Sequence, residues 1–496
     1  MQVRNHHLFP AHLGTKNGHL LMDNHDLVEL TREHGSPLFV FSERRLLDNA
    51  SGFLKAAKAG HSKAQVFFAS KACSNLHVLR AIRSQGVGIE VNSGGELWKA
   101  RSVGFAPQEI VFNGVAKTVD ELSAAISFGI KTINVESAFE LQRIADVSAG
   151  LGTKATVALR AVPGIGGGAT AGIQTGNATS KFGMTEPELQ IAISIALANP
   201  KSIDLAGMHM HIGSQVSEIS AFETGVEFVA QKAKEIAARL GKPLRQLNLG
   251  GGYPIDYAHL ASGSNLDEAT KLKAFSIQIS AAEMVTQVAA LAARRFGTDV
   301  EIHFEPGRSL VGDAAVLISC VENERMRGAV PWLYLDAGYN LLIDAAAVCW
   351  YYHMLNVSRM NAEPDKAFRI VGPLCDSADC FFDVEGEYLW KSVSKNLEHL
   401  PPETLAALKR DIIRLPETRN LPSETVAGDF IALLDTGAYS LGEMFQYCGR
   451  QRAKAIMISK QDRIVVLRER DRTEDLIDRA EIVVSTSIMG NNSYQN

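Results

Sequence analysis

Short apolar segments with the residue types of β-strands recur along roughly the first three hundred residues. The first four, at 65–70, 86–91, 109–114 and 131–136, begin about 22 residues apart. Four more stand at 155–160, 205–211, 246–249 and 301–304. The segments between them repeat apolar residues at helical spacing, as at 118–128, 138–149, 221–240 and 280–296. The pattern predicts eight strands that alternate with helices.

Strands that alternate with helices form parallel sheets, and eight such units suit a closed (β/α)8 barrel. An open, doubly wound sheet is the alternative architecture that this alternation allows. A leucine-rich repeat has a similar period, but its fixed pattern of Leu and Asn is absent. The barrel interpretation predicts that the chemistry lies at the C-terminal ends of the strands.

The pattern changes beyond about residue 308, where short β-like segments follow one another without long helices between them. They stand at 316–321, 332–336, 368–371, 429–434, 455–458 and 464–467. We therefore expect an α/β protein, with a TIM-type (β/α)8 barrel over residues 38–310 and a second, mainly β domain formed by residues 1–37 and 311–496. Within the second domain, residues 388–423 are charged, helix-like and punctuated by four prolines. This segment is interpreted as a solvated insertion, with a lid or an oligomer contact as the alternatives.

The composition is that of a globular protein, with 46% hydrophobic and 21% charged residues. The 50 Lys and Arg residues against 55 Asp and Glu residues leave a net charge of -5, which argues against nucleic acid or an anionic membrane as a partner. The six Cys residues are too few for a disulfide scaffold. The N-terminus lacks the apolar core of a signal peptide, and no stretch of about 18 residues is apolar throughout, so no membrane span is expected. A cytoplasmic protein is expected.

Lys71 follows the apolar segment VFFAS, at the predicted C-terminal end of the first barrel strand. A single Lys is usually a solvated surface charge. At this position, however, neighbouring apolar strands would desolvate the amine and lower its pKa, as a Schiff-base nucleophile requires.

The last two barrel strands are followed by residues suited to binding anions. Gly250, Gly251 and Gly252 follow the seventh strand, where backbone N–H groups free of side chains can converge on a phosphate. The eighth strand ends in the sequence EPGR, which contains Glu305 and Arg308. Arg308 can bind a phosphate or a carboxylate, and Glu305 needs a cationic partner. A salt bridge between the two is the simpler alternative.

His209 and His211 stand two residues apart at the end of the sixth strand, a spacing that could bind a metal ion. No third clustered ligand is apparent in the sequence, so no metal is expected. A nucleophilic Lys, a phosphate cradle and an acid able to hold a pyridinium proton are together what pyridoxal 5'-phosphate requires.

Eight segments make the sequence resemble the pyridoxal-phosphate-dependent decarboxylases of the alanine racemase fold, which are built on a barrel. They are FASKACSNLHVLR, EVNSGGEL, SKFG, HMHIGSQ, NLGGGYP, EPGRSLV, GPLCDSADC and DTGAYS. They fall between about residues 38 and 460 in the order of the family, and resemble most of all those of diaminopimelate decarboxylases. The related ornithine and arginine decarboxylases share many of them. The resemblance implies a carboxy-lyase that removes the α-carboxylate of an amino acid.

The resemblance implies a role for each matching residue of the barrel. Lys71 corresponds to the Schiff-base lysine, and His211 to the imidazole that stacks on the cofactor ring. Glu305 corresponds to the acid on the pyridine nitrogen, where barrel racemases carry Arg, and so favours decarboxylation over racemisation. The rest of the implied cofactor site comprises Ser214, Gly250, Gly251, Gly252, Gly307, Arg308 and Tyr439. Arg308 and Tyr439 are also expected to contact the substrate.

In the second domain, Cys375 corresponds to the thiol that protonates the substrate carbon. Asp376 corresponds to the acid that contacts the distal group of the substrate. Taken alone, Cys375 is interpreted as a buried apolar filler. The family implies a head-to-tail homodimer with shared active sites, in which Cys375 and Asp376 enter the site of the partner subunit.

Four positions depart from diaminopimelate decarboxylases. That family usually carries Arg-Pro-x-x-Tyr where this chain has residues 344–348, so that its substrate-gripping Arg and Tyr fall on Asp344 and Val348. Asp376 stands where Glu is common, and Glu90 stands where Asp is commoner. The substrate pocket is therefore predicted to be atypical, with Asp344 among its substrate-binding residues.

Three hypotheses compete for the function. The first is a diaminopimelate-decarboxylase-like enzyme of lysine synthesis. The second is the same chemistry on a basic amino acid or on a conjugated one, such as a citryl amino acid in siderophore synthesis. The third is a catalytically dead regulatory homologue, which the presence of Lys71, Glu305 and Cys375 disfavours. Because Asp344 reverses the charge of an Arg, meso-diaminopimelate is predicted to be a poor substrate.

Overall fold

Eight parallel strands close into a barrel in the order in which they follow one another along the chain. The computed structural model describes residues 9–165, 167–168, 176, 180–261 and 271–477. The barrel strands are β5 (Ala64–Ala69), β6 (Gly88–Val91), β7 (Ile110–Phe112), β8 (Thr132–Val135), β9 (Ala155–Arg160), β11 (Ile203–His209), β13 (Gln246–Asn248) and β14 (Glu301–Phe304). The predicted barrel is confirmed, and the open sheet is excluded because β14 pairs with β5 and β11 pairs with β9.

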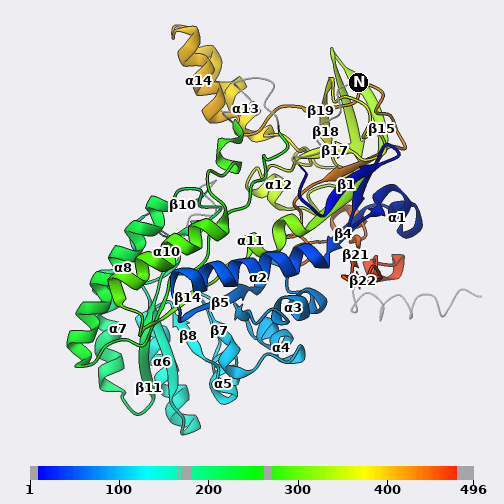
Figure 1. Ribbon diagram of the computed structural model, residues 1–496. Helices are drawn as coiled ribbons and strands as arrows, with labels where there is room; N and C mark the ends of the chain where they lie inside the picture. The colour runs from blue at the N-terminus through cyan, green and yellow to red at the C-terminus, as the bar shows by residue number, and fades with distance from the viewer. Residues whose placement is uncertain (1–8, 166, 169–175, 177–179, 262–270, 478–496) are drawn as a thin grey trace, which may run out of the picture.

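Helices cover the outside of the barrel (Figure 1). They are α2 (Glu43–Gly60), α3 (Leu76–Arg83), α4 (Gly94–Ser102), α5 (Val119–Phe128), α6 (Ala138–Leu151), α7 (Glu186–Ala198), α8 (Ile219–Leu240) and α10 (Ala281–Phe296). Local sequence sets where they begin. At α5 and α10, Thr118 and Ser280 cap the first turn and a Glu three residues later returns a hydrogen bond to the cap.

The second domain contains a nine-stranded mixed sheet. Its strands are β4 (Leu38–Ser42), β15 (Ala315–Arg327), β16 (Val330–Leu335), β17 (Met354–Asn356), β18 (Lys366–Val371), β19 (Arg419–Leu421), β20 (Phe430–Leu433), β21 (Lys454–Ile458) and β22 (Ile464–Arg468). Strand β4 corrects the expected start of the barrel at residue 38, because it pairs with β15 and β21. Its sequence LFVFS is buried at every position, and such a run suits the interior of either sheet.

The N-terminal part of the described chain adds a small antiparallel sheet and one helix to this domain. The sheet consists of β1 (Leu13–Lys16), β2 (His19–Met22) and β3 (His25–Asp26), and the helix is α1 (Leu27–His34). Apolar residues of β2 and α1 pack in one buried cluster with those of β4, β15 and β20. This cluster ties the chain before the barrel to the chain after it.

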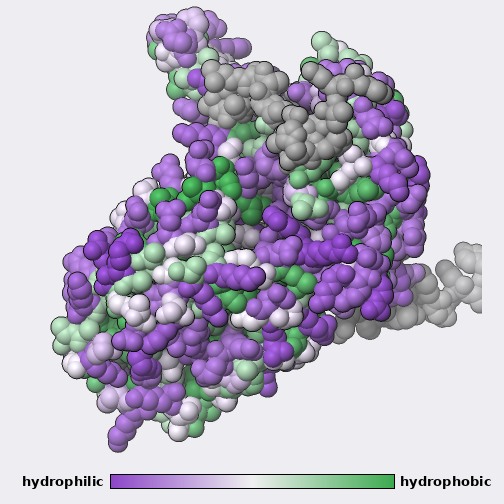
Figure 2. Space-filling model, viewed as in Figure 1, coloured by the Kyte–Doolittle hydropathy of each residue, from purple (hydrophilic) through white to green (hydrophobic). Residues whose placement is uncertain are grey.

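Two helices, α13 (Val384–Val393) and α14 (Pro402–Ile412), project from the second domain (Figure 1). Helix α14 contains no buried residue, and α13 buries only Gly386. Hydrophilic residues cover most of the face of the molecule that Figure 2 shows. No helix within the described ranges is both long enough and apolar enough to cross a lipid bilayer.

Gly207 on β11 pairs with Gln246 on β13 and lies close to its backbone. The pairing of β9 with β11 shifts register between Leu205 and Gly207, and a Cβ at Gly207 would clash with the carbonyl oxygen of Gln246. We expect Gly207→Ala to lower the free energy of unfolding by about 1–3 kcal/mol, because backbone atoms must move to admit the methyl group. Chemical denaturation measures this change.

The matched control is Gly52→Ala in α2, where a Cβ meets nothing within 4 Å. Ala is favoured over Gly inside a helix by roughly 0.5–1 kcal/mol, so this variant should be as stable as the wild type or more so. A Gly207→Ala variant with wild-type stability would contradict this expectation, because it would show that β11 and β13 can move apart to admit the methyl group without any loss of free energy of unfolding.

Candidate active site

A cavity of about 220 Å³ opens at the C-terminal ends of the barrel strands. Nine of the predicted site residues line it: Lys71, His211, Ser214, Gly252, Glu305, Gly307, Arg308, Asp344 and Tyr439. Four others, Gly250, Gly251, Cys375 and Asp376, are not among its lining residues. The closed barrel thus brings together side chains that lie hundreds of residues apart in the sequence.

Lys71 lies in the short 3-10 helix η2 (Ser70–Ala72), directly after β5. Its side chain is accessible because it projects into the cavity. Desolvation there lowers the pKa of the amine, but the Coulombic effects of Tyr439 and Glu90 outweigh it, so the pKa of Lys71 lies above its usual range. The prediction of a lowered pKa is therefore wrong, because it considered the apolar neighbours of Lys71 in the sequence and not Tyr439 of the second domain or Glu90 on β6.

Glu305, the residue after β14, carries an ionised carboxylate inside the barrel. Its Oε1 accepts hydrogen bonds from the side-chain amides of Asn248 (2.6 Å) and Asn134 (3.2 Å), and its Oε2 accepts one from Asn113 (2.9 Å). The imidazole Nε2 of His209 lies 3.3 Å from Oε2. Burial raises the pKa of Glu305, but His209 and the amide donors outweigh it and bring the pKa to about 2.

Arg308, the first residue of α11 (Arg308–Val311), has partners other than Glu305. Its Nη1 donates a hydrogen bond to the hydroxyl of Tyr257 (2.7 Å), and its guanidinium lies 4.1 Å from the centre of the Trp350 ring. The alternative of a salt bridge between Glu305 and Arg308 is therefore wrong. The two side chains leave the strand end toward different partners, so both charges remain available in the cavity.

The glycine triplet after β13 mainly positions other residues. The Gly250 N–H donates to Oδ1 of Asn248 (2.9 Å), and the Gly251 N–H donates to Nδ1 of His211 (3.1 Å). A Cβ at Gly251 would clash with a carbonyl oxygen of the segment after β14. Gly252, with φ of +100°, is the member that lines the cavity. The N–H groups of Gly250 and Gly251 thus have partners within the protein, and a phosphate in the cavity would meet Gly252.

His211 is a neutral imidazole in the wall of the cavity. Burial lowers the pKa of His211 well below its usual range, and the positive charges of Lys71 and Arg160 lower it further. Because Nδ1 accepts the Gly251 N–H, the ring proton is assigned to Nε2. The neutral ring can therefore cover a flat ligand without adding charge.

The loop after β18 holds Cys375 and Asp376 outside this cavity. Cys375 is exposed, so its interpretation as a buried filler is wrong. The Asp376 carboxylate accepts a hydrogen bond from the hydroxyl of Tyr339 (2.8 Å). The loop is held by the buried Asp379, whose carboxylate accepts the N–H groups of Leu374 (2.7 Å) and Tyr339 (2.8 Å).

Sequence reasoning missed four polar residues of the site: Asn113, Asn134, Arg160 and Tyr257. Three of them stand at or beside the C-terminal ends of β7, β8 and β9, so the rule that barrel chemistry follows the strands could have found them. Tyr257 lies in an irregular segment after β13, where no periodic pattern indicates that it contacts Arg308.

The donor set of the cavity fits pyridoxal phosphate. Arg160 has a buried Nη2 without a hydrogen-bond partner among the described residues, and Arg308 is a second cation for the anionic groups of the cofactor. Lys71 offers an amine, and the ionised Glu305 suits a protonated ring nitrogen. Over the ranges that the structure describes, no group of His, Cys, Asp and Glu residues could hold a metal ion.

Comparison with known proteins leads to the same cofactor. A sequence model described as the pyridoxal-binding domain of pyridoxal-dependent decarboxylases matches residues 49–312. The chain belongs to the pyridoxal-dependent decarboxylase family. It is an amino-acid decarboxylase, a lyase that uses pyridoxal phosphate.

The diaminopimelate decarboxylase of Archaeoglobus fulgidus is 31% identical to this decarboxylase over 468 residues, which are 94% of this chain and 98% of that protein. That of Zymomonas mobilis is 30% identical and covers 93% and 96%. The crystal structure of diaminopimelate decarboxylase from M. jannaschii with L-lysine has a TM-score of 0.77 at 28% identity, covering 95% and 97% of the two chains. A lysine/ornithine decarboxylase of Vibrio vulnificus, at 18% identity and a TM-score of 0.66, shares the fold.

The pKa values of two carboxyl groups in the cavity of the decarboxylase, those of Glu90 and Glu305, are shifted in opposite directions. Oε2 of Glu90 accepts a hydrogen bond from Asn92 (3.2 Å), whereas its buried Oε1 has no partner in the described part of the chain. Burial and the charge of Glu305 raise the pKa of Glu90 to about 8. At neutral pH, therefore, Glu90 holds a proton and Glu305 does not.

We expect Glu90→Gln to stabilise the cofactor-free enzyme relative to the wild type at alkaline pH. The folded chain keeps the Glu90 proton up to about pH 8, whereas an unfolded Glu loses it near roughly pH 4.3. The wild type therefore loses stability as the pH rises between these values, and the Gln variant does not. Denaturant unfolding at about pH 5 and about pH 8.5 should show the stability difference changing by at least about 1.4 kcal/mol. A difference that does not vary with pH would mean that Glu90 is already ionised.

Proposed function

We propose that this decarboxylase acts on an amino acid whose side chain ends in an amine or a conjugated group, and not on diaminopimelate, whose distal end is a second amino-acid group with a free α-carboxylate. The observation that carries the proposal is the position of Asp344, on α12 (Asp344–Ala347), in the wall of the cavity with Arg308. Burial raises the pKa of Asp344, and the charge of Arg308 opposes that shift. A cationic substrate group would favour the ionised form of Asp344, whereas a carboxylate would be repelled by it.

Two further residues, Glu443 and Val348, support a pocket that does not bind a distal carboxylate of the substrate. Burial and the charge of Asp344 raise the pKa of Glu443 to about 7, which makes Glu443 a second acid near Asp344. Val348 ends α12 and packs against the apolar core, so it supplies no hydrogen bond to a substrate carboxylate. Diaminopimelate remains the second candidate substrate, because the relatives at 30–31% identity are diaminopimelate decarboxylases.

The cavity residues have separate tasks in this reaction. Pyridoxal phosphate, when bound, takes up the electron pair that stays on the substrate as carbon dioxide leaves. Lys71 would supply the amine that anchors the cofactor, and His211 would cover one face of its ring. The ionised carboxylate of Glu305 would hold the proton at the ring nitrogen. Arg308, Ser214, Gly252, Gly307 and Tyr439 would bind the anionic groups of the cofactor and the substrate.

The proposed enzyme is a homodimer with shared active sites. Cys375 and Asp376 lie outside the cavity of their own chain, on a loop that Asp379 holds in place. Cys375 is exposed and Asp376 is half-buried, so that both can enter the cavity of a partner subunit packed against this loop. There Cys375 would donate the proton to the substrate carbon, and Asp376 would contact the distal group.

Mixing inactive Lys71→Ala and Cys375→Ala subunits tests the shared site. Random exchange makes half of the dimers mixed, and each mixed dimer has one intact site, so roughly a quarter of the wild-type activity should return. Carbon dioxide release measures activity, and native mass spectrometry of subunits that differ in mass confirms exchange. Complete exchange without recovery would place both residues in the site of one chain.

Comparing kcat/KM for diaminopimelate, ornithine, lysine and citryl diamino acids tests the substrate. Losing a charged hydrogen bond costs about 1.5–3 kcal/mol, so diaminopimelate should be roughly 10- to 150-fold poorer than the preferred basic or conjugated substrate. Asp344→Asn should narrow that gap by removing the repulsion, and Asp204→Asn, outside the cavity, should leave it unchanged. If the wild type prefers diaminopimelate by tenfold or more, Asp344 does not select against it, and lysine synthesis becomes the function.

A further inference from the structure

Arg160 is a cation of the cavity whose orientation is set by a buried acid. It is the last residue of β9, is only 5% exposed and lines the cavity. Its Nη1 donates a hydrogen bond to Oε1 of Glu136 at 2.5 Å, and its guanidinium packs over the ring of Phe182. Its Nη2 is buried and has no protein partner within the described ranges. A buried donor without such a partner is available to a ligand atom that enters the cavity.

Glu136 follows β8 directly and is not among the lining residues of the cavity. Its Oε2 accepts the N–H of Gly183 at 2.8 Å, so that one carboxylate joins Arg160 to the segment that precedes α7. Burial raises the pKa of Glu136, but the charge of Arg160 is the largest of the effects that outweigh it and lower the pKa below its usual range. The carboxylate is therefore ionised, and both of its oxygens have partners.

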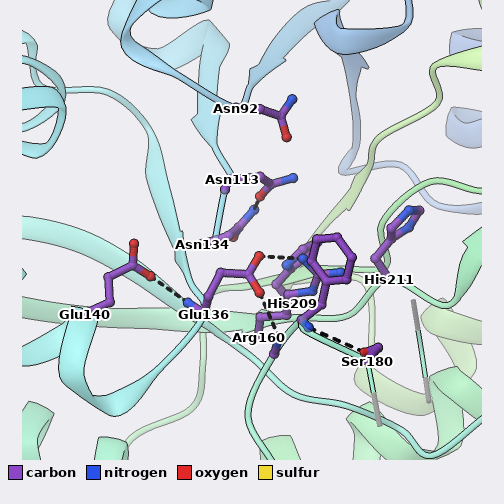
Figure 3. A network of polar contacts seen from close by, with 12 residues as sticks. Asn92, Asn113, Asn134, Glu136, Glu140, Arg160, Ser180, His209 and His211 are labelled. Atoms are coloured by element: carbon purple, nitrogen blue, oxygen red, sulfur yellow. Dashed lines mark hydrogen bonds and ion pairs between the residues drawn. The ribbon is translucent and has the colours of Figure 1, made fainter. Parts of the chain in front are cut away.

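The backbone of Glu136 is fixed in turn by contacts on the outer side. Its N–H donates to Oε2 of Glu140 on α6 at 2.7 Å, and Oε1 of Glu140 pairs with the buried Lys117 at 2.8 Å. Lys117 also donates to the carbonyl oxygen of Asn134 on β8 at 2.9 Å. Figure 3 shows Glu136 between Glu140 and Arg160. The position of Arg160 thus depends on residues outside the cavity wall.

We propose that Glu136 is a positioning residue, which holds Arg160 so that Nη2 faces the cavity and donates a hydrogen bond to an oxygen of the bound cofactor. The inference rests on the proposed binding of pyridoxal phosphate in this cavity. Without the Glu136 carboxylate, the guanidinium loses its fixed partner and can turn within the cavity. Its charge lowers the pKa of Lys71 and of His211, so a displaced Arg160 also changes the electrostatics at both groups.

Glu136→Gln tests this role, because the amide keeps one acceptor oxygen and replaces the other with a donor. It can therefore satisfy Arg160 or the Gly183 N–H, but not both. We expect the dissociation constant of the cofactor from the full-length holoenzyme, followed by visible absorbance on dilution, to rise at least about tenfold, with a shifted absorption maximum. Glu136→Asp keeps the charge on a shorter side chain and should recover part of that affinity.

A double-mutant cycle separates positioning from general stability. Arg160→Gln should weaken cofactor binding as much as Glu136→Gln, and the double variant should bind no more weakly than Arg160→Gln alone, because both residues act through one contact. The matched control is Asp204→Asn, which removes the ion pair with Arg245 outside the cavity and should leave the affinity unchanged.

Other results of these measurements would contradict either the positioning role of Glu136 or the placement of the cofactor. Additive losses in the double variant, or wild-type affinity and absorption in both Glu136→Gln and Glu136→Asp, would overturn the positioning role while the site stands. If Glu136→Gln does not fold, wild-type affinity in Glu136→Asp overturns the role by itself. Wild-type affinity in Arg160→Gln would instead overturn the cofactor placement on which the inference rests.

Discussion

The ionised carboxylate of Glu305 inside the barrel is the interaction on which the rest of the site depends. A carboxylate removed from water costs several kcal/mol unless hydrogen bonds and opposite charges offset that cost. Here three asparagine amides and one imidazole do so, and they come from the ends of β7, β8, β11 and β13. Those strands must keep their register and the barrel must close for the carboxylate to remain charged. The charge of Glu305 therefore depends on the same strand register that closes the barrel.

The two Arg side chains that line the cavity, Arg160 and Arg308, do not pair with the carboxylate of Glu305. Arg308 bonds to Tyr257 and Arg160 bonds to Glu136, and within the described residues neither forms an ion pair with Glu305. Their charges thus face the cavity, where a ligand that carries a phosphate and a carboxylate would meet them. Asp344 lies in the wall of the same cavity, where under the proposed function its carboxyl group would limit which distal groups of a substrate can be bound.

Much of the barrel could be predicted from the sequence, because strands that are buried on both faces appear as continuous apolar runs between amphipathic helices. The same property explains the error at β4, since its apolar run does not encode which sheet it joins. Hydrogen-bond partners were harder to predict. Glu305 and Arg308 are three residues apart, yet they bind different groups, and the pKa of Lys71 depends on Glu90 and Tyr439, which come from other elements. Such contacts exist only after the barrel has closed.

The proposed position of the cofactor is the claim that joins these observations, and borohydride reduction of the holoenzyme followed by peptide mass mapping tests it most directly. Reduction fixes the cofactor to the lysine that holds it, so the added mass identifies that residue. We expect the added mass on the peptide that contains Lys71 and on no other peptide. Added mass on a different lysine, or unchanged labelling of Lys71→Ala, would contradict the placement of the cofactor at the C-terminal ends of the barrel strands.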